Sequence, residues 1–391
     1  MGTRLLAGTG GGAAGRSDLV KKIVGLLLAA LILSASPAPA FETVRIGLLG
    51  PMTGSWSDEG LQAKQVVELL VRDLNEKGGI LGKPVELIDA DTAGTPKAIH
   101  AAAREMASLG VAAVVGPYGS DAAEAVQGIF NEARILQVAN GATTVSLTEK
   151  GFRYFFRTCP RDDEQGRVAA SLVRRFKFKR IAVLHDHSIY ARGLAEQLRV
   201  LLEKEIRVVF FDGLIPERQD YSALLTKMKA AGAEAVFFTG YYPEGGLLLR
   251  QKAEMGWKAP ILGGDANSNP ELVMIAGRDA AKGFLCVSSP VPGDIATQQA
   301  RAFLPAFGRQ YGRPLGSIYA MMAGDGLLAV AAAMRETKSA ETDKTSEFLR
   351  RKYKEHNGLT GRISFNEKGD RVGDVYRSYR VDAQGVFAPL P

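Results

Sequence analysis

Short apolar runs alternate with longer amphipathic segments through most of the chain. Val44–Leu49 is a largely apolar run that predicts a buried strand, and Gly50 and Pro51 end it. Gln62–Asn75 repeats apolar residues near the 3.6-residue period of a helix, and Val85–Asp91 starts the next strand. Strands that alternate with helices of ten or more residues predict βαβ units and parallel sheets.

The same alternation continues to residue 288, and its character changes after Pro290. Further strands are expected at Val111–Gly116, Ile135–Ala139, Tyr154–Thr158, Arg180–His185, Arg207–Gly213, Glu234–Gly240, Ala259–Gly264 and Gly283–Ser288. Further helices are expected at Lys97–Leu109, Asp121–Ala133, Glu164–Phe176, Ala191–Lys204, Tyr221–Ala231 and Glu244–Met255. The last part predicts helices at Gln298–Tyr311, Ser317–Arg335 and Ser346–Lys354, with closing strands near 362–365 and 375–381.

The first 40 residues have the parts of a secretory signal peptide. Lys21 and Lys22 supply positive charge, Ile23–Leu33 is an apolar core, and Ala38–Ala40 forms an A-x-A-like cleavage site. A membrane anchor is the alternative, but this core is shorter than the roughly 18–20 residues that a span needs. The sequence therefore predicts export to the periplasm and removal of residues 1–40.

Length and charge narrow the classes of protein. The chain has 391 residues, which is too long for one typical domain and sufficient for two. The formal net charge of +7 is spread along the sequence, without an interleaved basic and aromatic strip, so nucleic acid is not an expected partner. No Gly/Ser linker separates the halves, which indicates that the chain crosses between two lobes several times.

Cysteine and histidine residues leave two chemical possibilities to weigh. Cys159 and Cys286 are the two cysteines, and in an oxidising compartment they either pair or stay as buried thiols. His185 and His187 share one strand face, but no carboxylate or cysteine cluster with ligand spacing accompanies them. The sequence therefore predicts no metal site and no cofactor.

Polar residues gather in the turns that follow the predicted strands. Ser120 precedes a helix, where serine is first of all an N-cap, but a helix N-terminus with a free hydroxyl also suits a carboxylate. Gly141 and Thr143 follow the neighbouring strand and add further neutral donors. Tyr241 and Asp265 end two later strands, where an aspartate is more often a helix cap than a ligand group.

The segment VRIGLLGPMTGSWSDEG at Val44–Gly60, together with the order of these turns, resembles the type I periplasmic solute-binding proteins of branched-chain amino acid transporters. The resemblance covers about residues 42–385. It implies an α/β fold of two Rossmann-like lobes with parallel sheets joined by a three-crossover hinge, near 158–163, 285–291 and 368–374. It also implies an N-terminal lobe of 41–160 plus 289–370 and a C-terminal lobe of 161–288 plus 371–391.

The resemblance assigns roles to matching residues. It implies that the ligand's α-carboxylate is held by hydroxyl and backbone groups of Ser120, Gly141, Ala142 and Thr143. It implies that the second lobe closes over the ligand with Tyr190 and binds the ligand's ammonium with Tyr241 and Asp265. An aspartate stands at position 265 where glutamate is usual, so the ammonium is expected about one methylene deeper or bridged by a water.

The side-chain pocket departs from the branched-chain pattern at two positions. Glu59 stands where an aromatic residue is common, and Tyr118 stands where a small aliphatic residue is found. We expect Glu59 to face the solvent. An inward Glu59 would instead favour a ligand with a polar or hydrogen-bonding tail.

Four functions are weighed. The expected one is the extracytoplasmic amino-acid-binding subunit of an ATP-driven importer, a monomer that partners a membrane permease. The alternative is the same architecture with an aromatic acid or small amide as ligand. An exported enzyme is disfavoured because neither a G-x-S-x-G nor an H-E-x-x-H motif occurs. A sensory ectodomain is disfavoured because no membrane-spanning segment is predicted after residue 41.

Overall fold

The computed structural model describes residues 1–2, 43–373 and 375–390. Residues Thr43–Pro391 form one compact unit. The predicted signal peptide falls almost wholly outside the described residues and stays a prediction.

The first sheet contains five parallel strands in the order β2-β1-β3-β4-β5. The inner strand β1 is largely buried, and Ile46 pairs with Leu87 on one side and Ala113 on the other. The strands are β1 Val44–Gly50, β2 Val85–Asp91, β3 Ala113–Val115, β4 Leu136–Ala139 and β5 Phe155–Arg157. Parallel strands bring their carboxyl ends to one edge, so the turns after β1, β3 and β4 meet there.

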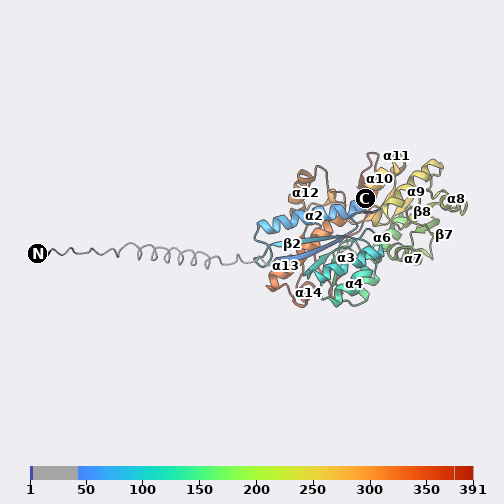
Figure 1. The fold of residues 1–391 in the computed structure, drawn as a ribbon. Helices are drawn as coiled ribbons and strands as arrows, with labels where there is room; N and C mark the ends of the chain where they lie inside the picture. The colour runs from blue at the N-terminus through green and yellow to red at the C-terminus, as the bar shows by residue number, and fades with distance from the viewer. Residues whose placement is uncertain (3–42, 374, 391) are drawn as a thin grey trace. The chain divides into compact units, whose positions relative to one another are not determined.

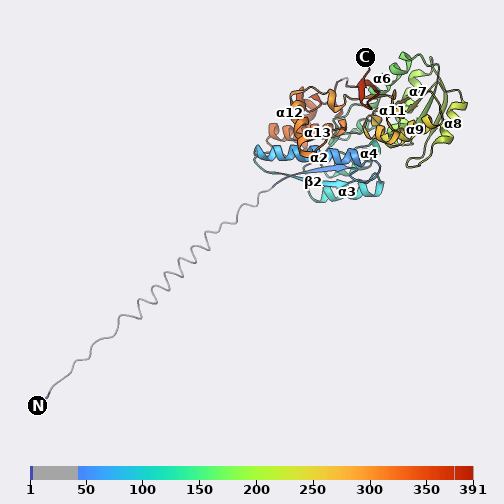
Figure 2. The same ribbon diagram turned by 90° about the horizontal axis from the view of Figure 1, so that it is seen from above.

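Helices cover both faces of this sheet. Helices α2, α12 and α13 lie on one side of the strands and α3 lies on the other (Figure 2). The apolar helix α13 packs against β3, β4 and α2 and supplies much of the core. The helices of this lobe are α2 Ser57–Glu76, α3 Pro96–Ser108, α4 Ser120–Glu132, α5 Ser146–Glu149, α12 Gln298–Tyr311, α13 Ile318–Thr337 and α14 Thr342–Arg351.

The second sheet contains seven strands in the order β14-β13-β10-β9-β8-β6-β7. Its strands β7 and β8 lie beside the helices α7, α8 and α9 (Figure 1). Five of the strands are parallel, and β13 and β14 add an antiparallel edge. These strands are β6 Arg180–His185, β7 Arg207–Gly213, β8 Ala235–Phe238, β9 Ile261–Gly263, β10 Leu285–Ser288, β13 Arg377–Val381 and β14 Phe387–Pro389. The accompanying helices are α6 Asp162–Arg175, α7 Ile189–Leu202, α8 Ser222–Ala230, α9 Tyr242–Glu254, η1 Asp265–Asn267, α10 Glu271–Ala276, α11 Arg278–Ala281 and η2 Pro292–Asp294.

The chain passes between the two sheets three times. It crosses between β5 and α6, between β10 and α12, and between β12 and β13. β12 (Gly361–Ile363) belongs to a small antiparallel pair with β11 (His356–Gly358). The α/β class with two parallel-sheet lobes is therefore confirmed, while the exact lobe boundaries stay a proposal.

Several predicted elements have different bounds. Helix α2 begins at Ser57, five residues before the expected start. The prediction placed the start too late because the first turn of the helix is polar and shows no apolar period. Its acidic residues Asp58 and Glu59 suit the positive end of a helix. The prediction was also wrong for α14, which begins at Thr342, and it omitted α5, α10 and α11 because one or two helical turns are too short to show a period.

One described helix, α13, is long and apolar enough to cross a membrane by length and composition. Most of its residues are buried against the first sheet and α2. Ser317 caps its first turn by accepting a hydrogen bond from the Ala320 N–H. Helix α13 is therefore apolar because it is a buried helix of the core.

Candidate functional site

The turns after β3 and β4 are joined to each other at the edge of the first sheet. Tyr118 and Gly141 form a parallel bridge, and the Gly119 N–H donates to the Gly141 carbonyl over 2.8 Å. Gly119 has a φ of 91°, a conformation that favours glycine, and it directs the chain into α4 at Ser120. The Ser120 hydroxyl accepts a hydrogen bond from the Thr144 N–H over 3.3 Å. The structure thus brings the predicted residues of these two turns together.

Gly141 is required by its aromatic neighbours. A Cβ at this position would lie 2.4 Å from Tyr118 Cδ2 and 3.1 Å from Tyr319 Cδ1. The rings of Tyr118 and Tyr319 pack edge to face with centroids 5.2 Å apart. Tyr319, which the sequence did not single out, therefore belongs to the wall of the same site.

Both backbone groups of Ala142 have partners within the protein. Its N–H donates to Cys159 Sγ over 3.2 Å, and its carbonyl accepts from Arg157 over 3.0 Å. The backbone contact that we expected from Ala142 to a ligand therefore competes with an existing bond. Cys159 and Cys286 are both free and buried, which resolves the open question in favour of two thiols. Burial raises the pKa of the Cys159 thiol to about 12.

Asp265 lies at the start of η1 on the second lobe, fixed by three neighbours. Its carboxylate accepts from the Tyr190 hydroxyl over 2.9 Å and from the Tyr376 hydroxyl over 3.0 Å. Its N–H donates to Gln165 Oε1 over 2.9 Å. The Tyr241 ring lies beside that of Tyr190, with centroids 5.6 Å apart. The predicted residues Tyr190, Tyr241 and Asp265 are thus brought together.

A second buried carboxyl, Asp162, accompanies Asp265. Gln165 links them by donating to Asp162 Oδ1 over 3.0 Å, and Asp162 Oδ2 has no partner among the described residues. Burial raises the pKa of Asp265, and burial followed by the charge of Asp265 raises the pKa of Asp162 well above its usual range. Two desolvated acids favour a cation between or beside them. The sequence did not single out Asp162, which lies in the predicted crossover 158–163. It also did not single out Gln165, which lies in the first turn of the helix predicted at Glu164–Phe176.

Glu59 is buried, so the expectation that it faces solvent was wrong. Only 4% of the residue is exposed. Its carboxylate accepts from Asn269 Nδ2 over 2.8 Å and from the Ser317 hydroxyl. Burial raises the pKa of Glu59 to about 7. The cause of the error is the earlier start of α2, which turns Glu59 away from the surface.

Trp56 is a further site residue that the sequence did not identify. Its ring lies against Tyr241 of the second lobe, with centroids 4.1 Å apart, and its edge faces Tyr118 at 6.1 Å. A cavity of about 100 Å³ lies behind it and is lined by Trp56, Thr92, Gly94, Thr95, Ile99, Tyr118, Asp121, Ala122 and Ala125. The sequence feature that could have identified Trp56 is its position as the only aromatic residue in the polar turn after the first strand.

Polar bonds also join the two lobes around the aromatic group. The Tyr242 hydroxyl donates to the Ser55 carbonyl over 3.1 Å, and the Ile189 N–H donates to the Asp121 carboxylate over 3.1 Å. Asn269 Nδ2 contacts Asp58 at 3.1 Å in addition to Glu59. The lobes are therefore in contact around the candidate site. Carboxyls lie on both lobes there: Asp58, Glu59 and Asp121 on the first, and Asp162 and Asp265 on the second.

His185 and His187 form no metal site with other residues. Their rings meet edge to face at 5.0 Å, and His185 Nδ1 accepts from the His187 N–H. Across residues 43–373 and 375–390, no group of three or more His, Cys, Asp or Glu side chains is arranged to hold a metal ion.

Two α/β lobes with facing polar groups at their strand ends define a solute-binding protein of the periplasmic binding class. The family model described as periplasmic binding protein matches residues 43–385, and the chain belongs to this family. It is 34% identical over 371 residues to the Leu/Ile/Val-binding protein BraC3 of Rhizobium johnstonii, covering 93% of this chain and 98% of that protein.

Solved structures agree with this assignment. A leucine-binding protein LivK from Thermotoga maritima superposes with a TM-score of 0.83 at 27% identity, covering 89% of this chain and 98% of that one. The branched-chain amino acid transporter substrate-binding protein LivJ from Streptococcus pneumoniae, solved with isoleucine, gives 0.79 at 27% identity, covering 89% and 100%. These relatives are binding proteins and not enzymes, as the sequence predicted for this chain.

Proposed function

We propose that this protein binds an amino acid between its lobes and delivers it to the permease of an ABC importer. The observation that carries the proposal is the separation of charge across the site. Ser120 and Thr143 present neutral donors on one lobe, and Asp265 presents a buried carboxylate on the other. A zwitterion needs a carboxylate site of uncharged dipoles and a separate anionic site for its ammonium.

In this arrangement each residue has a distinct part. Ser120 and Thr143, with backbone groups at Gly141, hold the ligand's carboxylate, and Asp265 pairs with the ammonium. The ring of Tyr241 adds a cation–π contribution of about 0.5–2 kcal/mol. Tyr190 orients Asp265 and closes over the ligand. Relatives named for leucine, isoleucine and valine support an amino-acid ligand for this chain.

The residues expected around the ligand's side chain differ from the branched-chain pattern. The buried pair Glu59 and Asn269, together with Tyr118 next to Trp56, makes the pocket more polar than a purely aliphatic one. We propose that the preferred ligand carries a small or hydrogen-bonding side chain. We also propose that residues 1–40 direct export to the periplasm, where the protein acts as a monomer.

Thermal shift against a ligand panel tests this function. The protein is refolded to remove any bound solute and is then mixed with α-amino acids, aromatic acids and small amides. A rise of several degrees with α-amino acids supports the proposal and ranks their side chains. A response only to acids that lack an amine would exclude the ammonium site and support the aromatic-acid alternative.

Asp265→Ala tests the ammonium assignment. Removing this carboxylate leaves a buried ammonium without its partner, so binding of the best amino acid in the panel should weaken by about 3–5 kcal/mol. Isothermal titration calorimetry measures the loss, and Asp212→Ala on the exposed edge strand β7 is the control. An affinity that stays within threefold of the wild type would show that Asp265 does not bind the ammonium.

A further inference from the structure

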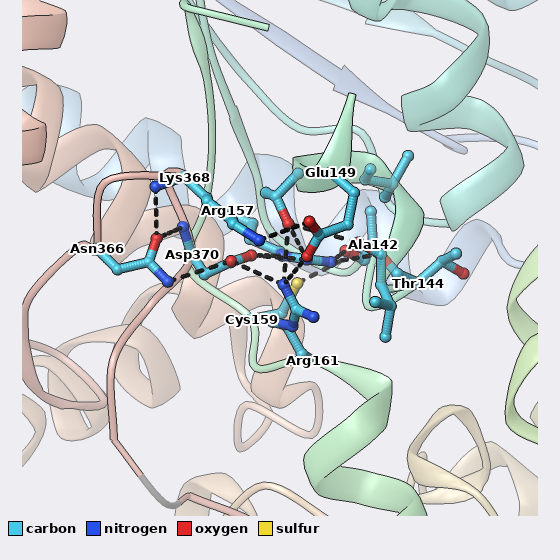
Figure 3. Close-up of polar contacts among 12 residues, drawn as sticks. Ala142, Thr144, Glu149, Arg157, Cys159, Arg161, Asn366, Lys368 and Asp370 are labelled. Carbon is cyan, nitrogen blue, oxygen red and sulfur yellow. Dashed lines mark hydrogen bonds and ion pairs between the residues drawn. The ribbon is translucent and has the colours of Figure 1, made fainter. Parts of the chain in front are cut away.

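Arg157, at the end of β5, connects the carboxylate side of the site to the crossovers (Figure 3). Its side chain is fully buried, and all of its donors have partners. One terminal nitrogen donates to the carbonyls of Ala142 over 3.0 Å and Thr144 over 2.7 Å. The others reach Thr148 and Asp370, both over 2.7 Å. A planar guanidinium suits this role because its donors form a rigid fork.

The two carbonyls that Arg157 binds determine the direction of the next peptide groups. In a trans peptide the N–H points opposite to the carbonyl of the same plane. Holding the Ala142 carbonyl toward Arg157 therefore directs the Thr143 N–H away from it. The following peptide is fixed at both ends, because the Thr143 carbonyl accepts from the Asp162 N–H and the Thr144 N–H donates to Ser120.

In this arrangement the Thr143 N–H donates to no acceptor among the described residues. Only 3% of Thr143 is exposed. Buried backbone donors are almost always paired in native proteins. A donor that is held in place and lacks a protein partner, next to the Ser120 hydroxyl, is a position for an acceptor on a ligand.

Asp370 anchors Arg157 from the chain segment that crosses between β12 and β13. Only 1% of Asp370 is exposed, and its second oxygen contacts Arg161 over 3.1 Å and Asn366 over 3.3 Å. Burial acts to raise the pKa of Asp370, but the charge of Arg157 and its hydrogen bonds outweigh burial and lower it. Asp370 is therefore held as an anion in the buried network.

We propose that Arg157 is a positioning residue for ligand binding, which holds the loop 142–144 so that the Thr143 N–H points at the ligand's carboxylate. Through Asp370 and Arg161 it ties this loop to two of the three crossovers. The inference rests on the proposed function to the extent that the ligand carries a carboxylate. It does not require the ligand to carry an amine.

Arg157→Lys tests the inference because lysine keeps the charge but lacks the fork that bridges two carbonyls. The probes are L-threonine and L-threoninamide, which share a hydrogen-bonding side chain and differ only in the carboxylate, with benzoate and benzamide as the second pair. We expect affinity for the carboxylate probe to fall at least tenfold and affinity for the amide to fall less than threefold, measured by calorimetry. Asp370→Asn, which loosens the anchor, should change the same ratio by about threefold.

Arg350→Lys is the matched control. Arg350 also binds backbone carbonyls, those of Phe152, Arg153, Phe155 and Glu367, but none in the loop 142–144. It should leave the ratio of the two affinities unchanged. If Arg157→Lys and Asp370→Asn weaken both members of a probe pair equally, Arg157 has only a structural role and the inference is overturned.

A ligand-free measurement separates this inference from the proposed function. Hydrogen exchange of residues 139–148, followed by mass spectrometry, should accelerate at least tenfold in Arg157→Lys and stay unchanged in Arg350→Lys. If the wild type responds to none of the carboxylate probes, the proposed function fails and this exchange experiment alone decides whether Arg157 positions the loop. Equal exchange in the wild type and Arg157→Lys would overturn the inference.

Discussion

At the residue scale, buried carboxyls give this site its chemical character. Asp265, Asp162 and Glu59 are each at most 4% exposed, and burial raises the pKa of all three. Asp265 has two tyrosine hydroxyls as donors, whereas Asp162 Oδ2 has none among the described residues. Such groups cost folding free energy unless a cation or a proton compensates them.

Glu59→Gln should remove one pH dependence of stability. The pKa of Glu59 is raised from 4.5 to about 7 in the folded state, so the folded state keeps a proton that the unfolded state loses in this window. The free energy of unfolding of the wild type therefore falls as pH rises from about 4.5 to 7, by about 3 kcal/mol for this group. Glutamine does not titrate, so the difference between variant and wild type should grow over this window.

Chemical denaturation at pH 4.5, 6 and 7.5 measures that difference. Glu76→Gln, exposed near the end of the same helix, is the control and should show the wild-type profile. A difference between Glu59→Gln and wild type that is constant with pH would mean that Glu59 does not carry a raised pKa.

At the element scale, the first turn of α2 and the loop after η1 form a contact between the lobes. Asn269 donates to both Asp58 and Glu59, and Ser317 at the start of α13 donates to Glu59 from the first lobe. The acidic turn lies at the N-terminus of α2, where the helix dipole favours negative charge. The contact therefore stabilises the arrangement in which the lobes meet.

Asn269→Ala should weaken ligand binding, although Asn269 is not one of the residues proposed to bind the ligand's carboxylate or ammonium. It removes two hydrogen bonds between lobes and leaves Asp58 and Glu59 without this donor, at a cost of about 1–3 kcal/mol. Because binding draws on the closed state, affinity should fall by roughly 5- to 150-fold. Calorimetry measures this, with Asn357→Ala on the exposed face of β11 as control. Unchanged affinity would show that this contact does not contribute to closure.

At the scale of the whole molecule, the candidate site is formed by residues of both lobes where the lobes meet. Trp56 from the first lobe lies against Tyr241 from the second, and Tyr242 bonds to Ser55 beside them. Two of the three crossovers, those between β5 and α6 and between β12 and β13, meet in the network of Arg157, Arg161 and Asp370 next to the loop 142–144. If the proposed function holds, ligand binding and lobe closure share these residues.

Trp56 should report closure by its fluorescence. The chain has two tryptophans, and Trp257 is buried in the core of the second lobe, so Trp257→Phe leaves Trp56 as the only emitter. Ligand binding should shift or quench its emission because the Tyr241 ring moves relative to it. Trp56→Phe, which keeps Trp257, should show no change. A response of equal size in both variants would mean that the signal does not come from the lobe interface.

The sequence alone determined the alternation of strands and helices, the α/β class and the family, because these depend on local periodicity and on turn residues that recur in order. It also located Ser120, Thr143, Tyr190, Tyr241 and Asp265 at strand ends, since parallel strands bring such turns to one edge. It predicted the strand β13 near 375–381 but not its antiparallel pairing, and it omitted the short helices and the three-residue strands β11 and β14, which are too short to show a period.

Only the tertiary structure decided which side chains are desolvated and what they contact. Glu59 is buried because α2 starts early and packs near α13, more than 250 residues away in sequence. Asp162, Gln165, Trp56 and Tyr319 join the site through contacts between distant segments, and Arg157 acts through carbonyls that no residue type reveals. Burial and long-range hydrogen bonds are properties of packing, so they are not visible in the order of residues along the chain.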